Sequence, residues 1–580
     1  MRTVNNNELR LSNVGEQHTL VGWCSKKRNL GGLIFIDLRD RAGLTQLVVD
    51  PANPFYEVAN SVKNEYVIKV EGEVIERSSK NANLPTGDIE INVKKLVILS
   101  TSEQTPFPIQ DQVDCSEDLR LKYRYLDLRR PAMQRNLIMR HKAAISIRNY
   151  FDNHGFIEIE TPVLGKSTPE GARDFLVPSR VHNGSFYALP QSPQMYKQLL
   201  MVAGLEKYFQ IVKCFRDEDL RADRQLEFTQ VDVEMSFVEE EDIYQLVEEL
   251  LVKIWKDVLG IDIATPFIRM SWDDCMNYYG SDKPDMRFEM LLQNLDTWAQ
   301  DIDFVVFQNA LNNQGHVKGI VVEGGASKYS RKEIDRLTEL AKKYHAKGLA
   351  WLKYENDTLS GSIAKFVTPE KAAELIAKYH LKNDDLVLMV ADSLENCNFA
   401  LGGLRLQVAK EMKMIDPSLF KFLWVIDWPL FEYSEEEQRY VAAHHPFTSP
   451  QEGDEDKMIT DPASCKAKAY DIVLNGYELG GGSIRIHNQE VQAKMFKALG
   501  LSDADVQLQF SYFVNALKYG TPPHGGFAIG FDRLIMLLAG SNNIREVIAF
   551  PKVASAKCLM SDAPTEVSEK QLDELGIKIK

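Results

Sequence analysis

The amino-acid sequence predicts a multidomain α+β protein, and three observations support that prediction. The 580 residues are 44% hydrophobic and 26% charged, an ordinary globular composition and enough chain for about three or four domains. Short alternating strands fill the first hundred residues, while strands and helices mix in the remainder. A stretch with its own strand–helix passes interrupts that remainder, which indicates an inserted domain.

Composition also excludes several classes of protein. The net charge of −15 argues against general binding of polyanions, so any nucleic-acid contact must use local basic patches. The seven cysteines are scattered without a C-x-x-C pair, which favours free thiols over a zinc site or a disulfide framework. No signal pattern and no apolar run of transmembrane length occurs, so we expect a cytoplasmic protein without membrane contact.

Residues 1–105 are predicted to form a small barrel. Five short strands with strict alternation and one short helix near residues 55–63 suit an OB-fold β-barrel. Such barrels stack bases on aromatic side chains and surround them with basic ones, a role that Arg28 and Phe35 suit. The alternative for Phe35 is a core position, because a Phe on a strand is more often buried.

Residues 106–131 are rich in proline and charge, and we interpret them as a hinge or linker. Their basic residues would either contact a phosphate backbone or simply be solvated. The cluster comprises Arg120, Lys122, Arg124, Arg129 and Arg130.

Residues 132–284 carry the stretch on which the interpretation depends. A helical pattern over 133–153 precedes a strand that ends at Pro162. Residues 207–237 then read as strand, charged loop, strand, and alternation puts Phe228, Asp232 and Glu234 on one face of the second strand. An aromatic and carboxylates on an accessible face predict the floor of a polar pocket. A solvated hairpin tip is the alternative.

Residues 285–412 are predicted to be the inserted α+β domain. Strands are expected at 304–307, 317–322, 349–354 and 385–392, and helices at 331–344 and 369–379. No cluster of candidate catalytic groups occurs in this segment.

Residues 413–555 return to candidate chemistry, and residues 556–580 form a C-terminal extension. His444 and His445 are adjacent, and a structural and a functional role are equally open for them. Asp471 and Glu478 are the pair of carboxylates expected to bind Mg²⁺, which accepts few carboxylates and keeps positions for phosphate oxygens. Gly530 then separates a strand from a helix that carries Arg533 in its first turn.

Three of these stretches resemble the signature motifs of class II aminoacyl-tRNA synthetases. F-R-D-E at 215–218 with E-F-T-Q-x-D-x-E at 227–234 resembles motif 2, and G-F-D-R at 530–533 resembles motif 3. The helix, strand and Pro162 resemble motif 1, which builds a dimer interface in that family. Nearly the whole chain resembles the bacterial-type aspartyl-tRNA synthetases, which carry a GAD-type insertion between motifs 2 and 3. The resemblance implies a catalytic domain built on an antiparallel sheet flanked by helices, its two parts at 132–284 and 413–555.

The resemblance also implies roles for individual residues. The catalytic pair is Arg216 and Arg533. The aspartate-binding set is Glu170, Ser192, Gln194, Lys197, Arg216, Asp232, His444 and Arg485. The ATP-binding set is Arg216, Asp217, Glu218, Gln225, Phe228, Gln230, His445, Glu478, Gly530, Phe531, Asp532 and Arg533. The anticodon contacts are Arg28, Phe35 and Gln46, and the positions that discriminate between tRNAs are Leu30 and Lys80.

The implied activity is ATP-dependent aspartylation of tRNA(Asp) by a homodimer that requires Mg²⁺. A buried ligand carboxylate needs cationic partners, and Lys197 and Arg485 would supply two for L-aspartate. A form that also charges tRNA(Asn) is the alternative; the residues at Leu30 and Lys80 favour the strict form. A catalytically inactive nucleic-acid-binding module is disfavoured because Arg216 and Arg533 are both present. A tRNA-independent amidating ligase is disfavoured because it has no use for the N-terminal barrel.

Overall fold

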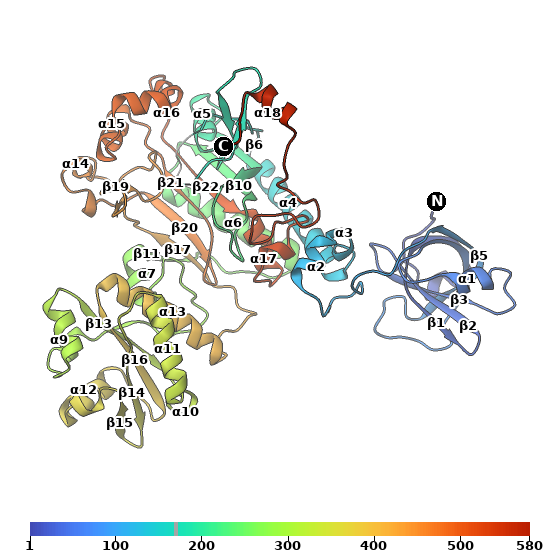
Figure 1. The fold of residues 1–580 in the computed structure, drawn as a ribbon, viewed down its shortest axis with the longest axis horizontal. Helices are drawn as coiled ribbons and strands as arrows, with labels where there is room; N and C mark the ends of the chain where they lie inside the picture. The colour runs from blue at the N-terminus through green and yellow to red at the C-terminus, as the bar shows by residue number, and fades with distance from the viewer. Residues whose placement is uncertain (168–171) are drawn as a thin grey trace. The chain divides into compact units, whose positions relative to one another are not determined.

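The computed structural model describes residues 1–167 and 172–580, which divide into two compact units (Figure 1). One unit contains residues 1–138 with 545–566, and the other contains 139–544 with 567–580. The predicted fold class is confirmed: an N-terminal OB-type barrel, a large sheet with flanking helices and a second α/β sheet are all present. None of the helices in the described residues is both long and apolar enough to cross a membrane.

The N-terminal strands close into a barrel in the order β1-β2-β3-β5-β4. Successive side chains of a strand point alternately into and out of the barrel. Ile34, Ile36 and Leu38 of β2 are buried in the barrel core, while Phe35 is half-buried and lies outside that core. The core alternative for Phe35 is therefore wrong. The elements are β1 (Gln17–Leu30), β2 (Leu33–Arg39), β3 (Leu44–Val49), α1 (Tyr56–Ser61), β4 (Val67–Glu76) and β5 (Ile89–Ser100).

The segment after the barrel contains two short helices, α2 (Glu117–Lys122) and α3 (Arg124–Asp127). Arg124 and Arg130 are buried and both bind the buried carboxylate of Asp127, at 2.5 and 2.7 Å. Arg124 also donates to the Ile548 carbonyl at 2.7 Å. These two buried arginines stabilise the segment itself, so both expected roles, contact with a phosphate backbone and simple solvation, are wrong for them.

The second unit is built on an eight-stranded sheet in the order β11-β17-β20-β21-β22-β10-β9-β6. All neighbours are antiparallel except the parallel pairs at its two edges, β11–β17 and β6–β9. The strands are β6 (Ile157–Glu158), β9 (Lys207–Phe215), β10 (Glu227–Ser236), β11 (Ile268–Ser271), β17 (Phe422–Ile426), β20 (Ala469–Leu474), β21 (Tyr477–Ile484) and β22 (His524–Gly530).

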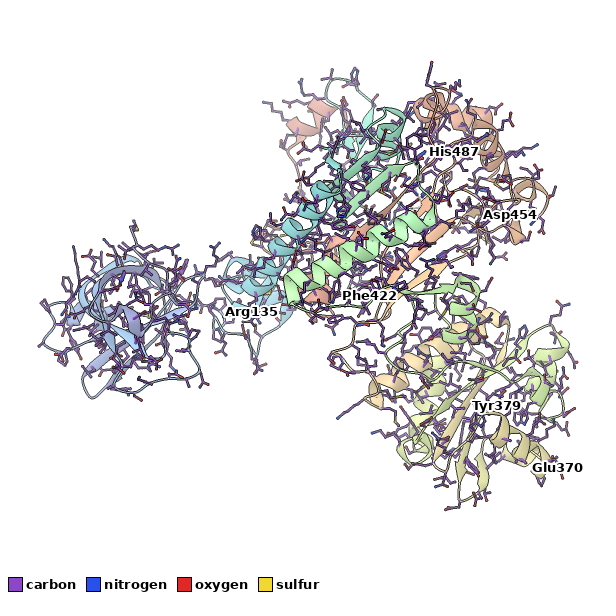
Figure 2. All side chains as sticks on the ribbon, turned by 180° about the vertical axis from the view of Figure 1, so that it is seen from behind. Arg135, Glu370, Tyr379, Phe422, Asp454 and His487 are labelled. Carbon is purple, nitrogen blue, oxygen red and sulfur yellow. The ribbon has the colours of Figure 1, made fainter. Side chains whose placement is uncertain are left out.

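Helices flank this sheet. Figure 2 shows α4 and α6 side by side, and Tyr150 Oη of α4 donates to the Leu246 carbonyl of α6 at 3.0 Å. The glycine at 260, with φ 71°, ends α6 in the left-handed conformation that suits glycine. The helices are α4 (Pro131–Asn153), α5 (Gln194–Val202), α6 (Glu240–Leu259), α7 (Trp272–Tyr279), α14 (Lys457–Thr460), α15 (Gln489–Ala498), α16 (Asp503–Ala516), α17 (Phe531–Leu538) and α18 (Glu569–Leu575). Two small hairpins are β7 (Leu176–Pro178) with β8 (Phe186–Ala188), and β18 (Phe431–Ser434) with β19 (Arg439–Ala442).

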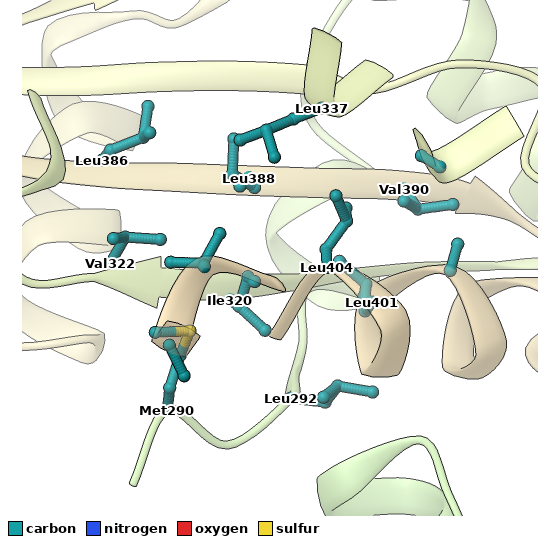
Figure 3. Close-up of a cluster of buried hydrophobic side chains, with 14 of the residues drawn as sticks. Met290, Leu292, Ile320, Val322, Leu337, Leu386, Leu388, Val390, Leu401 and Leu404 are labelled. Carbon is teal, nitrogen blue, oxygen red and sulfur yellow. The ribbon is translucent and has the colours of Figure 1, made fainter. Parts of the chain in front are cut away.

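The inserted segment forms its own five-stranded sheet in the order β12-β13-β16-β14-β15, with a buried apolar core (Figure 3). Its strands are β12 (Gln293–Asn294), β13 (His316–Val322), β14 (Ala350–Glu355), β15 (Thr358–Gly361) and β16 (Asp385–Asp392). Its helices are α8 (Asp296–Ala299), α9 (Val305–Asn312), α10 (Gly325–Lys328), α11 (Arg331–Lys343), α12 (Pro369–Lys378) and α13 (Leu394–Glu411).

The strand expected at 304–307 is wrong, because this segment begins helix α9. The run of Phe and Val favours a strand locally. However, Phe304, Phe307 and Leu311 are spaced by three and four and pack into one core, which only a helix permits, while Val305 and Val306 remain exposed.

Candidate active site

Two strands that lie about three hundred residues apart form the floor of a deep cavity in the second unit. β10 pairs antiparallel with β22, and the register puts Glu234 opposite Gly526. A Cβ on Gly526 would lie 2.0 Å from Glu234 Oε2, so glycine is needed to admit that carboxylate. The polar face predicted for residues 228–234 thus lies beside the strand of the G-F-D-R stretch.

The cavity measures about 370 Å³ and gathers most of the candidate residues. Those that line it are Ser192, Gln194, Lys197, Arg216, Glu218, Gln225, Phe228, Gln230, Asp232, His444, His445, Asp471, Glu478, Arg485, Gly530, Asp532 and Arg533. Lining residues outside the predicted site sets include Asp223, Arg224, Thr229, Ser483 and Ile544.

Two candidates lie outside the cavity, and a third is not among the described residues. Glu170 lies outside the described residues. The side chain of Asp217 is half-exposed and its amide pairs with the Arg173 carbonyl at 3.0 Å. The ring of Phe531 is buried beneath the Arg140 guanidinium, 4.6 Å from its centroid. The structure does not bring the side chains of Asp217 and Phe531 into this cavity.

The two candidate catalytic arginines line the same cavity, Arg216 directly after the end of β9 and Arg533 in the first turn of α17. The Arg216 guanidinium stacks over the Phe228 ring at 5.1 Å, so a flat aromatic face and a donor fork are adjacent. Arg533 donates Nη1 to the Glu478 carbonyl, and its Nη2 lies 3.3 Å from Asp223. Nε of Arg216 and of Arg533 are both buried without a hydrogen-bond partner in the described residues, so donors remain for an anionic ligand.

At the other end of the cavity, two cations and two carboxylates form a closed network. Lys197 Nζ lies 2.7 Å from Asp232 Oδ1 and 3.4 Å from Glu234 Oε2. Arg485 grips Glu234 with Nε at 2.9 Å and Nη2 at 3.1 Å. All four side chains are buried. Lys197 and Arg485, the two residues expected to bind the ligand carboxylate, thus already bind carboxylates of the protein.

These buried carboxylates differ in their acidity. Burial opposes the ionised form of Glu234, but Arg485 and Lys197 outweigh it and lower its pKa. Burial also raises the pKa of Asp232, and Lys197 offsets that only in part. Asp232 Oδ2 is buried and has no hydrogen-bond partner in the described residues, so it can accept a further donor such as an ammonium group.

The adjacent histidines sit against this network as neutral rings. Burial, reinforced by the charge of Arg485, lowers the pKa of His444 to about 4 and that of His445 well below its usual value. Arg485 Nη1 lies 2.8 Å from His445 Nε2 and 2.6 Å from Ser483 Oγ. Since Arg485 only donates, Nε2 of His445 is the acceptor and stays unprotonated.

The carboxylates expected to hold a metal ion lie on adjacent strands, Asp471 on β20 and Glu478 on β21. Burial raises the pKa of Asp471 well above its usual range, and the nearby charge of Glu478 raises it further. A divalent cation would relieve both effects. Within residues 1–167 and 172–580 no three His, Cys, Asp or Glu side chains form a metal cluster. A pair of carboxylates fits Mg²⁺, which takes one or two of them and completes its shell with phosphates and water.

Comparison with known proteins identifies the family. A family model described as "tRNA synthetases class II (D, K and N)" matches residues 116–554, and one described as "OB-fold nucleic acid binding domain" matches 18–99. The "Aspartate--tRNA ligase" of Bacillus licheniformis is 56% identical over 584 residues, which cover 100% of this chain and 99% of that protein. The chain belongs to the class II tRNA synthetases, among the aspartate–tRNA ligases.

Other relatives agree with this assignment. The "Aspartate--tRNA(Asp/Asn) ligase" of Anoxybacillus flavithermus is 55% identical over 571 residues, covering 98% of this chain and 96% of that ligase. The asparaginyl-tRNA synthetase of Pyrococcus horikoshii, solved with asparaginyl-adenylate, matches with a TM-score of 0.58 at 20% identity and covers 94% of this chain and 97% of that one. That second similarity shows a shared fold.

The residues expected to contact the anticodon in this ligase family lie together on the outside of the barrel. Arg28 of β1 is paired with Phe35 of β2, and Arg28 Nη2 donates to Gln46 Oε1 of β3 at 3.1 Å. Leu30 is 61% exposed at the end of β1, and the exposed Lys80 binds Glu76 at 2.8 Å. Leu30 and Lys80 are thus exposed, Arg28 and Phe35 are half-buried, and Gln46 is buried.

Sequence reasoning about this ligase missed the role of Glu234. Its alternation with Asp232 placed it on the pocket face, but nothing local indicated that it would bind Lys197 and Arg485 at once. One physical rule could have found it. Two cations buried in one pocket need carboxylates of the protein to balance their charge, apart from any ligand.

Proposed function

We propose that this enzyme joins L-aspartate to tRNA(Asp) in two steps. The α-carboxylate of aspartate attacks the α-phosphorus of ATP, and pyrophosphate leaves as aspartyl-adenylate forms. The terminal ribose hydroxyl of the tRNA then attacks the aspartyl carbonyl carbon, and AMP leaves. The single observation that supports the proposal most is that Arg216, Arg533, Lys197 and Arg485 all line one cavity.

The ATP half of the cavity suits a nucleotide. Phe228 would stack on the adenine, while Arg216 donates to the α-phosphate whose charge increases during attack. Arg533 lies across the cavity, where it would bind the terminal phosphate. Gln230 and Glu218 complete that wall. Neither step needs a side-chain nucleophile, because positioning and stabilisation of charge account for the rate.

The aspartate half suits an amino acid with an acidic side chain. Asp232 Oδ2 would accept a hydrogen bond from the substrate ammonium, with Ser192 and Gln194 beside it. Lys197 and Arg485 would donate to the side-chain carboxylate, and neutral His444 would line the closed site. Glu170 is also proposed to contact the amino acid.

Asp471 and Glu478 would hold Mg²⁺, which would neutralise phosphate charge when bound. Burial and the nearby charge of Glu478 raise the pKa of Asp471, which supports this assignment because a bound cation would relieve both effects. Lys and Arg side chains of the cavity do the remaining neutralisation.

The barrel is proposed to bind the anticodon through Arg28, Phe35 and Gln46, with Phe35 as the stacking platform. Leu30 and Lys80 support strict use of tRNA(Asp). A second candidate is a form that also charges tRNA(Asn), because the relatives include ligases named for both tRNAs. Aminoacylation of both purified tRNAs separates the two: charging of tRNA(Asn) at a comparable rate contradicts the strict form.

A homodimer is proposed as the working form. Exposed apolar side chains on α4, β6 and the segment after it would be covered by a second copy, among them Ile145, Ile157, Val163 and Leu164. Light scattering on the purified chain tests this, since a monomer at micromolar concentration would contradict it.

Aspartate-dependent exchange of pyrophosphate into ATP tests the activity itself. Arg216→Ala should abolish exchange and leave tRNA binding nearly unchanged, because Arg216 lies in the cavity and the proposed anticodon face lies on the barrel. Exchange near the wild-type rate in this variant would refute the role of Arg216. Absence of any aspartate-dependent exchange in the wild type would refute the proposed function.

A further inference from the structure

A buried arginine in the inserted domain fixes the backbone of the segment that enters that domain. Arg405 on α13 is 1% exposed, and its guanidinium donates to the backbone carbonyls of Asp285, Phe288, Glu289 and Met290 at 2.9–3.0 Å. It also stacks on the Phe288 ring at 3.9 Å. A guanidinium has five N–H donors in a rigid planar fork, whereas a lysine ammonium has three on a flexible stem, so arginine is better suited to hold four carbonyls in fixed positions.

The segment held by Arg405 belongs to the core of the inserted domain at one end. Met290 and Leu292 pack with Leu401 and Leu404 of the same helix (Figure 3). This end therefore moves with the domain, because close-packed apolar cores transmit displacement.

At its other end the segment touches a turn of the catalytic sheet. The turn joins β20 to β21, and a Cβ built on Gly476 would lie 3.2 Å from Asp285 Cβ. Asp285 is itself buried, and its carboxylate is held by Arg287 Nε at 2.9 Å and Nη2 at 2.6 Å. The side chain of Asp285 is thus held in place next to Gly476, which has a φ of 85°.

The segment that leaves the inserted domain holds the same turn from a second direction. Asn475 Nδ2 donates to the Leu419 carbonyl at 2.8 Å, and its Oδ1 accepts from the Lys421 amide at 2.9 Å. Both connections of the inserted domain therefore contact the two residues of this turn. Glu478 follows the turn by two residues, and its carbonyl accepts from Arg533.

We propose that Arg405 is a positioning residue for the ATP half of the active site. By fixing residues 285–290 it sets the β20–β21 turn, and thereby the carboxylates of Asp471 and Glu478, relative to Arg533. The inserted domain thus supports nucleotide binding from outside the cavity. This inference depends on the proposed function, because it assigns ATP to that half of the site.

Two substitutions test it. Arg405→Met keeps the length of the side chain and removes every donor, and Arg405→Lys keeps the charge but loses the fork. We expect KM for ATP in pyrophosphate exchange to rise roughly tenfold in Arg405→Met, with an intermediate value in Arg405→Lys. KM for aspartate should stay within about twofold, since the lysine–arginine network that would bind it does not touch the turn.

Two further readouts do not depend on turnover. Backbone amides of residues 474–478 should exchange with deuterium faster in Arg405→Met, and calorimetry should show weaker ATP binding. Arg336→Met is the matched control, because Arg336 lies in the same domain, is half-exposed and binds Glu411 in a surface ion pair at 2.8 Å. It should leave all four measurements unchanged.

Gly476→Ala provides a second route if Arg405→Met does not fold. It should produce the same rise in KM for ATP with Arg405 intact, because alanine strains the turn at φ 85° and its Cβ would lie 3.2 Å from Asp285 Cβ. Equal increases in both KM values, or unchanged ATP binding in folded variants of both sites, would overturn the proposal. A wild-type enzyme without aspartate-dependent exchange would instead refute the function on which it depends.

Discussion

Replacing Lys197 by Met is the sharpest test of how the aspartate half of the cavity works. Lys197 is 2% exposed, and its ammonium is within 2.7 Å of Asp232 and 3.4 Å of Glu234. The substitution keeps the volume of the side chain but leaves two buried carboxylates with Arg485 as their only cation in this network. Loss of one member of a buried, hydrogen-bonded charge pair costs about 2–5 kcal/mol.

That range converts into a measurable change in affinity. Since every 1.4 kcal/mol is about tenfold, KM for aspartate should rise roughly 30-fold to a few thousandfold. KM for ATP should change by less than about threefold, because Phe228 and Arg216 at the other end stay in place. Pyrophosphate exchange, measured against each substrate in turn, gives both constants.

Stability must be measured beside activity, because breaking a buried ion pair also costs about 3–5 kcal/mol of folding free energy. The cost should lie near the lower limit, since the raised pKa of Asp232 lets that carboxyl take up a proton when Lys197 is lost. Urea unfolding reports this directly. Lys213→Met, an exposed lysine on neighbouring β9, is the control. A KM for aspartate within about threefold of the wild type, in a folded variant, would refute the reasoning.

Two other predictions concern the remaining groups of the cavity. Gly481→Ala places a Cβ 2.0 Å from Asp471 Oδ1, so KM for ATP should rise at least about tenfold while KM for aspartate is unchanged. The control is Gly165→Ala, whose Cβ would lie 3.7 Å from its nearest neighbour, and it should alter neither KM. Equal effects of the two substitutions would contradict the assignment of Asp471 to metal binding. His444 stays neutral in the folded chain down to about pH 4, whereas the unfolded chain protonates it near its ordinary value of 6.5. The unfolded state therefore binds more protons between these values, and the free energy of unfolding should fall as pH decreases through that window. His444→Gln should flatten this part of the urea-midpoint profile against pH, and an unchanged slope would contradict the lowered pKa.

The sequence predicted those features that depend on local periodicity. Alternation along residues 228–234 placed Phe228, Gln230 and Asp232 on one face, and all three line the cavity. These predictions succeed because the direction of a side chain on a strand follows from its position in the pleat.

What the sequence could not predict depends on non-local pairing. No local pattern shows that β10 lies beside β22, because the register of two strands so distant in the chain is decided by the packed sheet. The error at 304–307 has the same origin: β-branched residues favour a strand until the core that receives Phe304, Phe307 and Leu311 is known. The sequence also did not predict the ion pairs of Lys197, because the carboxylate that pairs with a lysine depends on which residues the fold brings close to it and not on their separation in the sequence.

The paired state of these cations changes the argument for selecting aspartate over asparagine. In the sequence-based view, positive charge in excess attracts the acidic side chain. In the structure, Lys197 and Arg485 are balanced by Asp232 and Glu234, and both histidines are neutral, so net charge in this half contributes little. What remains is donor geometry, because lysine and arginine present only N–H groups to a ligand. The side-chain carboxylate of aspartate accepts hydrogen bonds from both Lys197 and Arg485. The amide NH2 group of asparagine is itself a donor, so it would face their N–H groups and leave buried donors without acceptors. This free-energy penalty selects aspartate because it disfavours the binding of asparagine. It requires a rigid network, which the two hydrogen bonds from Arg485 to Glu234 provide.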